Sequence, residues 1–199
     1  MKIIVIGSSG TIGQAVVKEL ESRHEIIKAG FKSGDIIVDI RDINSIEAMF
    51  KNIAQVDAVV LATGKVHFGE FMQLHEQEYN IGLQDKLMGQ VNVVLIGRNY
   101  LNEGGSFTLT SGILSEDPIR YGSSASMVNG ALNSFVTAAA IEMPNKQRIN
   151  CVSPTVVTEA MDSYGSYFRG FKSVNVSEVA LAYSKSIEGL QTGKVYKVL

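Results

Sequence analysis

The chain is poor in several features that would point to particular classes of protein. Among its 199 residues, Cys151 is the only cysteine, which excludes a disulfide framework and suits a reducing compartment. No run of about 20 apolar residues occurs, as a membrane-spanning helix would require. A formal charge of −2 provides no basic surface for nucleic acid and no polybasic membrane anchor. These absences predict a cytoplasmic protein whose partners are neither nucleic acids nor membranes.

Short apolar runs alternate with segments of helical periodicity along the whole chain. The expected strands are residues 2–6, 24–30, 35–40, 56–64, 106–111, 148–154 and 194–199. One helix is expected after the first strand, and another after Asn44, which would cap it. Three more are expected over 76–98, 124–142 and 176–188. Strands that alternate with helices favour a parallel sheet covered on both faces. We therefore expect residues 1–199 to form a single doubly wound Rossmann-type α/β domain with a mostly parallel sheet of about seven strands.

A glycine-rich turn connects the first strand to the first helix. Its sequence, Gly7-Ser8-Ser9-Gly10-Thr11-Ile12-Gly13, allows a tight turn and a close approach of the backbone to a pyrophosphate. The spacing GxxGxxG differs from GxGxxG, so the position between a buried strand and an amphipathic helix carries the prediction of dinucleotide binding. A structural turn that binds nothing is the alternative.

The end of the second strand bears on which dinucleotide binds. An NAD site usually places Asp or Glu here, but no acid precedes Asp35. Lys32 and Ser33 suit a 2′-phosphate, which a carboxylate would repel. We therefore expect NADP rather than NAD, with Phe31 against the adenine face; a solvated loop lysine is the alternative for Lys32.

The segment from Ser111 to Phe135 has the form of an active-site rim that lacks the usual chemical groups. It leads from an apolar strand into a helix of small residues, with serines and Tyr121 at the junction. No lysine occurs between Lys86 and Lys146, and no histidine follows His75. His67 and His75 lack an HExxH spacing, so no metal site is expected.

These features, taken in order, resemble the short-chain dehydrogenase/reductase family over nearly the whole chain. Asp39 and Ile40 match the adenine-contacting acid and its apolar neighbour, and Ala62-Thr63-Gly64 stands where Asn-Ala-Gly is usual. Asn80 takes the place of an active-site asparagine, and Ser111 lies at or next to the catalytic serine. The resemblance also extends to the cofactor loop after the sixth strand, which is Pro154, Thr155 and Val156, with Thr155 in place of a glycine.

Two catalytic groups of that family are missing. The family uses a tyrosine as the acid or base and a lysine four residues later that lowers the tyrosine pKa. Alignment of the helix places Ala125 and Asn129 at these two positions. Tyr121 lies four residues too early; a shifted loop would bring its hydroxyl toward Ser111, and a tyrosine that only covers the pocket mouth is the alternative. The resemblance thus implies a catalytic set of Ser111, Tyr121 and Asn80.

The resemblance implies an NADP-dependent oxidoreductase that acts on a small carbonyl or alcohol through a rearranged site. A catalytically silent NADP-binding sensor or partner-binding protein is the main alternative, and an isomerase or epimerase is a third. Family members associate through the two long helices that flank the fifth strand. We therefore expect a homodimer or homotetramer built on 76–98 and 124–142.

Overall fold

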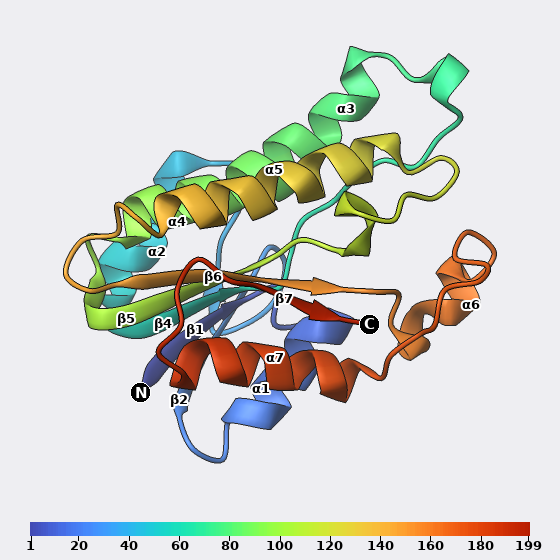
Figure 1. Cartoon of the computed structure of the whole chain (residues 1–199). Coiled ribbons are helices and arrows are strands. Elements are labelled where there is room, and N and C mark those ends of the chain that lie inside the picture. The colour runs from blue at the N-terminus through green and yellow to red at the C-terminus, as the bar shows by residue number, and fades with distance from the viewer.

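Seven parallel strands form one sheet in the computed structural model, which describes all residues 1–199, in the order β3-β2-β1-β4-β5-β6-β7 (Figure 1). The strands are β1 (Lys2–Ile6), β2 (Glu25–Gly30), β3 (Ile36–Ile37), β4 (Val56–Leu61), β5 (Leu101–Thr110), β6 (Arg148–Pro154) and β7 (Val195–Val198). The α-helices are α1 (Thr11–Leu20), α2 (Ile43–Ile53), α3 (Glu76–Gly82), α4 (Gln90–Gly97), α5 (Ser123–Ala139), α6 (Met161–Tyr164) and α7 (Val176–Glu188). The expected α/β fold with a Rossmann-type sheet is confirmed.

Helices cover both faces of this sheet (Figure 1). Side chains alternate along β1: Ile4 and Ile6 join the core beneath α2, α4 and α5, whereas Ile3 and Val5 join the core beneath α1 and α7. All four are buried, which explains why the strand reads as a continuous apolar run rather than an alternating one.

Two boundaries differ from the sequence prediction. The run 35–40 contributes only the two-residue β3, because it lies at the sheet edge and pairs with β2 alone. Helix α2 is capped by Asp42 instead of Asn44; the Asp42 carboxylate accepts a hydrogen bond from the Asn44 backbone N–H. Asp42 holds the extended backbone that an N-cap residue adopts, and Asn44 already lies inside the helix.

The long helix expected over 76–98 is interrupted by a π-helical segment. Helix α3 leads into the π-helical segment η2 (Leu83–Gly89), which is followed directly by the α-helix α4. A π-helical segment makes i→i+5 hydrogen bonds and is frequent at functional sites. The interruption places residues of η2 beside the ends of β4 and β5, where the site lies.

The strand order reverses between β1 and β4, since the chain proceeds from β1 toward β3 and then returns past β1 to β4. In open parallel sheets, ligands bind outside the carboxyl ends of the strands at such a reversal. In Figure 1, the segment that carries α6 extends beyond the arrowhead of β6 at this same edge of the sheet.

Glu188 joins α7 to the end of α1 and gives the fold a predictable response to acid. Its carboxylate accepts hydrogen bonds from Arg23, Ser184 and His24, which lower its pKa to about 2. Because the folded pKa is below the unfolded one, this stabilisation is present above about pH 4.5 and is lost as pH falls toward 2. Solvent reaches the carboxylate, so we expect about 1 kcal/mol.

Glu188→Gln should therefore lower the urea midpoint at pH 7 and match the wild type near pH 2.5. Urea titrations at both pH values measure this difference. An equal difference at the two pH values would contradict the assignment to ionised Glu188, and Glu178→Gln, an exposed carboxylate at the other end of α7, is the control.

Candidate active site

Two hollows at the carboxyl edge of the sheet join into one cleft. The first has a volume of about 400 Å³ and extends from the glycine turn to the end of β2. The second, of about 270 Å³, lies over the ends of β4, β5 and β6. Ala62 and Thr63 line both, so the cleft is continuous across the strand-order reversal. An elongated ligand with a separate group in each hollow fits this shape better than a compact one.

The glycine turn is packed so closely that two of its glycines admit no side chain. Gly7 has a φ of +84°, and a Cβ there would lie 2.4 Å from the Ala62 carbonyl oxygen. A Cβ on Gly13 would lie 2.0 Å from the Gly7 carbonyl oxygen. At Gly10 a Cβ would meet nothing closer than 3.4 Å, and this residue faces the cleft. The turn thus holds the N-terminus of α1 against β1 and leaves backbone N–H groups beside the hollow, as pyrophosphate binding requires.

The outer end of the cleft carries an aromatic ring and two cations. Phe31 and Lys32 line the hollow at the end of β2, and Asp39 and Arg41 line it after β3. Arg41 forms an ion pair with Asp39 at 2.7 Å, which lowers the pKa of that carboxyl, and its guanidinium lies over the Phe31 ring at 5.3 Å. The hollow as a whole is lined by three cations, Lys32, Arg41 and Lys65, and by the carboxylates of Asp39 and Asp85, so its net formal charge is positive.

The floor of the inner cavity is fixed by a buried hydrogen-bond network at the end of β5. The Gln90 side chain accepts from the Thr110 N–H at 2.9 Å and donates to the carbonyls of Thr110 and Lys86, each at 3.0 Å. The Thr110 hydroxyl donates to the Leu61 carbonyl and accepts from Tyr183. Gln90 has no exposed surface, and burial raises the pKa of Tyr183 far above its usual range. The network therefore joins β4, β5, α7 and α4, the helix that begins with Gln90.

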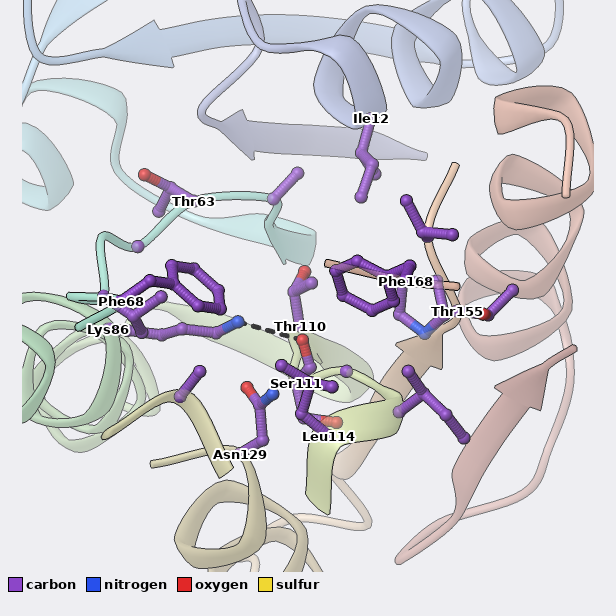
Figure 2. A pocket seen from close by; sticks show the side chains of 18 residues that line it. Ile12, Thr63, Phe68, Lys86, Thr110, Ser111, Leu114, Asn129, Thr155 and Phe168 are labelled. Atoms are coloured by element: carbon purple, nitrogen blue, oxygen red, sulfur yellow. Dashed lines mark hydrogen bonds between the residues drawn. The ribbon is translucent and has the colours of Figure 1, made fainter. Parts of the chain in front are cut away.

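Lys86, on η2, points into this cavity (Figure 2). Its ammonium donates one hydrogen bond, to the Ser111 carbonyl at 3.0 Å, and no carboxylate lies within ion-pair distance. Desolvation lowers the pKa of Lys86 to about 8. Gly64 makes room for it: its φ is +125°, and a Cβ would lie 2.8 Å from the Lys86 Cα. Asp85 accepts from the Lys65 N–H at 3.0 Å and fastens the same loop to η2.

Ser111 and Asn129 bring further polar atoms to the cavity wall (Figure 2). Both residues are buried, and neither the Ser111 hydroxyl nor the Asn129 amide oxygen has a hydrogen-bond partner. Ala125 also lines this cavity, and its methyl group leaves space that a larger side chain would fill. Buried polar atoms without partners are uncommon in folded proteins, and they indicate a place where a ligand supplies the missing bonds.

The segment from Val157 to Val174, called the lid, covers one side of the inner cavity with Phe168. Phe168 follows α6 and packs with Ile113, Leu114 and Val156 in a small apolar cluster. The two ends of the lid are joined by a bridge between Val157 and Val174, and the Thr155 hydroxyl donates to the Lys172 carbonyl at 3.2 Å. Half of the residues that line the cavity are hydrophobic, so its inner surface suits a ligand with an apolar portion.

The structure gathers most of the expected cofactor residues in the cleft. The residues that line it are Gly7, Ser9, Gly10, Ile12, Phe31, Lys32, Asp39, Ile40, Ala62, Thr63, Gly64, Pro154, Thr155 and Val156. Four others do not line it. Ser8 turns inward and donates to the Ala29 carbonyl, Gly13 is buried behind the turn, and Thr11 and Ser33 are exposed to solvent elsewhere.

Of the three expected catalytic residues, only Ser111 lines the inner cavity. Asn80 lies on α3, is half-buried, does not line the inner cavity, and donates to Glu76 at 3.5 Å. Tyr121 lies in an outer hollow with Gly69, its φ is +69°, and its ring contacts Tyr167 edge-on at 6.3 Å. The Arg120 guanidinium lies over the Tyr121 ring and reaches Glu70 at 3.8 Å, away from Ser111. The mouth-covering interpretation of Tyr121 agrees with this position.

Sequence reasoning missed four charged residues that line the cleft: Arg41, Lys65, Asp85 and Lys86. Arg41 comes two residues after Asp39, and a cation so near the acid that the family resemblance assigns to the adenine is a signal in the sequence. Lys86 lies six residues beyond Asn80 on what reads as one helix. Its position opposite Ser111 depends on η2, and the periodicity of the segment contains no sign of that interruption.

Comparison with known proteins identifies the family. A family model described as enoyl-(acyl carrier protein) reductase matches residues 11–190. A short chain dehydrogenase of Passalora fulva, claC, is 28% identical over 158 residues, which cover 76% of this chain and 57% of that protein. The chain belongs to the short-chain dehydrogenase/reductase family. L-xylulose reductase of Bos taurus, another relative, is 22% identical over 80% of this chain and 73% of its own.

Solved structures agree with this family membership. The protein lin1944 of Listeria innocua is 48% identical, with a TM-score of 0.99 over the full length of both chains. A small-chain dehydrogenase solved in complex with NADPH is 26% identical, with a TM-score of 0.88 over 100% of this chain and 96% of its own. The chain spans just over half the length of claC, although it spans nearly all of both solved structures.

Three further observations concern membrane spans, metal ligands and the single cysteine. No helix is long and apolar enough to cross a membrane. No three His, Cys, Asp or Glu side chains come together as metal ligands would. Cys151 is buried in β6, and desolvation raises the pKa of its thiol to about 11, so it is neutral at pH 7.

Proposed function

We propose that this short-chain dehydrogenase/reductase is an NADP-dependent oxidoreductase that reduces a small carbonyl compound with an apolar portion, or oxidises the corresponding alcohol. The observation that carries the proposal is the continuous cleft, which has a glycine turn at its centre and unpartnered polar atoms at its inner end. When bound, NADP(H) supplies the hydride chemistry. The whole chain, 1–199, acts as the cofactor-binding domain in this proposal.

The residues present suit each part of that cofactor. Gly7, Ser9 and Gly10 would hold the pyrophosphate at the N-terminus of α1, and Phe31 would lie against the adenine. Lys32, assisted by Arg41, would bind the 2′-phosphate through charge-assisted hydrogen bonds. Preference for NADP also has the support of the relative that was solved with NADPH.

The inner cavity would orient the substrate. Ser111 would donate a hydrogen bond to the substrate oxygen, since its hydroxyl makes no regular hydrogen bond in the protein and the Cys151 thiol beside it is only a weak partner. Asn129, at the position of the family's lysine, would bind the nicotinamide ribose through its amide. Phe168 and its apolar neighbours would exclude water from the reacting atoms.

Titration with NADPH and NADH, followed by a panel of carbonyl compounds, tests this proposal. NADPH should bind more tightly than NADH, and Lys32→Met should weaken NADPH binding about tenfold while NADH binding stays unchanged. Absorbance at the reduced nicotinamide band should fall with aliphatic and aromatic aldehydes, ketones or quinones. The control variant is Lys51→Met, which changes an exposed lysine on α2 and should leave the affinity for NADPH unchanged. Equal affinity for the two cofactors would contradict the NADP preference, and NADPH binding without turnover would favour the silent sensor.

A homodimer or homotetramer remains part of the proposal. Ile81, Met88 and Leu95 recur at every seventh residue along α3, η2 and α4, and all three are exposed. Met127 on α5 adds an exposed apolar side chain on the neighbouring helix. A second copy of the chain would cover these side chains, which supports the association expected from the family.

A further inference from the structure

Lys86 is a cation in the cavity wall whose charge nothing in the protein neutralises. An ammonium has three N–H donors, and only one of them is used, by the Ser111 carbonyl. A buried charge without a counterion destabilises a fold, so proteins seldom retain one for structural reasons alone. A methionine would fill the same space at lower free energy. The charge therefore points to an interaction with something that enters the cavity.

The surrounding structure is arranged to hold Lys86 in this position. Gly64 has no side chain, which allows the Lys86 backbone to approach the end of β4. Gln90 binds the Lys86 carbonyl, and the Asp85 carboxylate binds the loop that contains Gly64. Three separate contacts thus fix the lysine at the point where it faces the buried Ser111 hydroxyl and Asn129 (Figure 2).

Resting on the oxidoreductase function above, we propose that the Lys86 ammonium is the proton donor to the substrate oxygen, in place of the family's absent tyrosine. In reduction, a C–H bond would form at the carbonyl carbon with a hydride supplied by bound NADPH, which would become NADP⁺, and the C=O π electrons would move onto the oxygen. That oxygen forms an O–H bond with a proton from Lys86 Nζ, while Ser111 donates a hydrogen bond to it. The neutral Lys86 amine then regains a proton from water in the cleft.

The electrostatics of the cavity suit this role. The pKa of Lys86, lowered to about 8 by desolvation, lies much nearer to neutral pH than that of an ordinary lysine or tyrosine. The charged or titratable groups around it do not compensate its charge at pH 7. Cys151, on β6, is neutral because its pKa is about 11, and the Asp85 carboxylate, on the same helical segment, accepts from the Lys65 N–H and forms no ion pair with Lys86. A donor that is protonated at pH 7 and gives up its proton easily meets the requirement for general acid catalysis.

Two substitutions separate proton donation from charge alone. Lys86→Met removes both, whereas Lys86→Arg keeps the positive charge but cannot release a proton at neutral pH. With the best carbonyl substrate from the panel, both variants should lose 10² to 10⁴ in kcat. Lys18→Met, an exposed lysine on α1 that forms no ion pair, is the matched control and should keep the wild-type rate. NADPH binding, measured by fluorescence, should persist in all three variants.

The pH dependence provides readouts that a structural role of Lys86 would not move. The kcat of the wild type for reduction should fall tenfold per pH unit above about pH 8, and Lys86→Met should have a flat profile. Without any cofactor, Lys86→Met should melt at a higher temperature than the wild type at pH 7. This difference should shrink between pH 8 and 10.5 as the wild-type lysine loses its charge.

The outcomes distinguish this inference from the proposed function. Wild-type turnover that persists in Lys86→Arg would overturn proton donation, and so would a melting difference that is constant from pH 7 to 10. In either case, the oxidoreductase function would stand. Failure of the wild type to bind NADPH, or binding without turnover of any carbonyl, would remove the proposed function and the role of Lys86 with it.

Discussion

Gly13→Ala is expected to destabilise the protein by about 3 kcal/mol or more, the upper end of the range for overpacked sites. The added Cβ would lie 2.0 Å from the Gly7 carbonyl oxygen and 2.9 Å from the Ser8 Cα. These are backbone atoms of the turn, so no side-chain rotation relieves the contact. Helix α1 would have to move away from β1, and the cradle expected to bind the pyrophosphate would open.

Gly10→Ala is the matched control for this prediction. It makes the same chemical change in the same turn, but its Cβ meets nothing closer than 3.4 Å. Urea unfolding should show that Gly10→Ala loses no more than about 1 kcal/mol of stability. This small loss arises because alanine is a poorer N-cap than glycine. Similar unfolding midpoints for the two variants would contradict the close packing of α1 against the turn.

Gln90→Leu is expected to have an effect of similar size, about 3 kcal/mol, through lost hydrogen bonds. The leucine keeps the volume but leaves the Thr110 N–H and the carbonyls of Thr110 and Lys86 without this partner. Each unsatisfied buried group typically costs about 1 to 3 kcal/mol, and relaxation makes the sum smaller than the parts. For a chain of this size, the melting temperature should fall by about 6 to 12 °C.

Gln84→Leu, on the same π-helical segment, controls for the substitution itself. Gln84 is exposed, and no hydrogen bond of its side chain occurs in the structure. Calorimetry should place Gln84→Leu within about 2 °C of the wild type, as for an ordinary surface change. If Gln90→Leu melted at the wild-type temperature, the network would not be the support of the cavity floor that its geometry indicates.

Most of the fold was predictable from local sequence because each element carries its own signal. The apolar runs Ile3–Ile6 of β1 and Ala58–Leu61 of β4 are continuous since both faces of these strands are buried, and β6 ends at Pro154. The predicted boundaries were wrong where neighbouring residues decide them. β3 is short because only β2 pairs with it, and the backbone geometry makes Asp42, not Asn44, the N-cap of α2.

The cofactor half of the candidate site was largely predictable for a similar reason. Its residues lie directly after strand ends, and parallel strands bring those ends to one edge of the sheet. Ser8 and Ser33 depart from the prediction because neighbours in a turn point in different directions. Ser8 donates to the Ala29 carbonyl inside the protein, and Ser33 faces solvent. Sequence order places a turn but does not orient each side chain in it.

The catalytic half depended on tertiary structure. By itself, the sequence determined the α/β order and the glycine turn, and its resemblance to the family predicts Ser111 as the catalytic serine and Ala125 and Asn129 in place of the tyrosine and lysine. Only the tertiary structure placed Lys86 instead of Asn80 beside Ser111. That choice depends on the π-helical bonding of η2 and on the absence of a Cβ at Gly64. Both concern contacts between segments distant in sequence, which the helical periodicity of residues 76–98 does not encode.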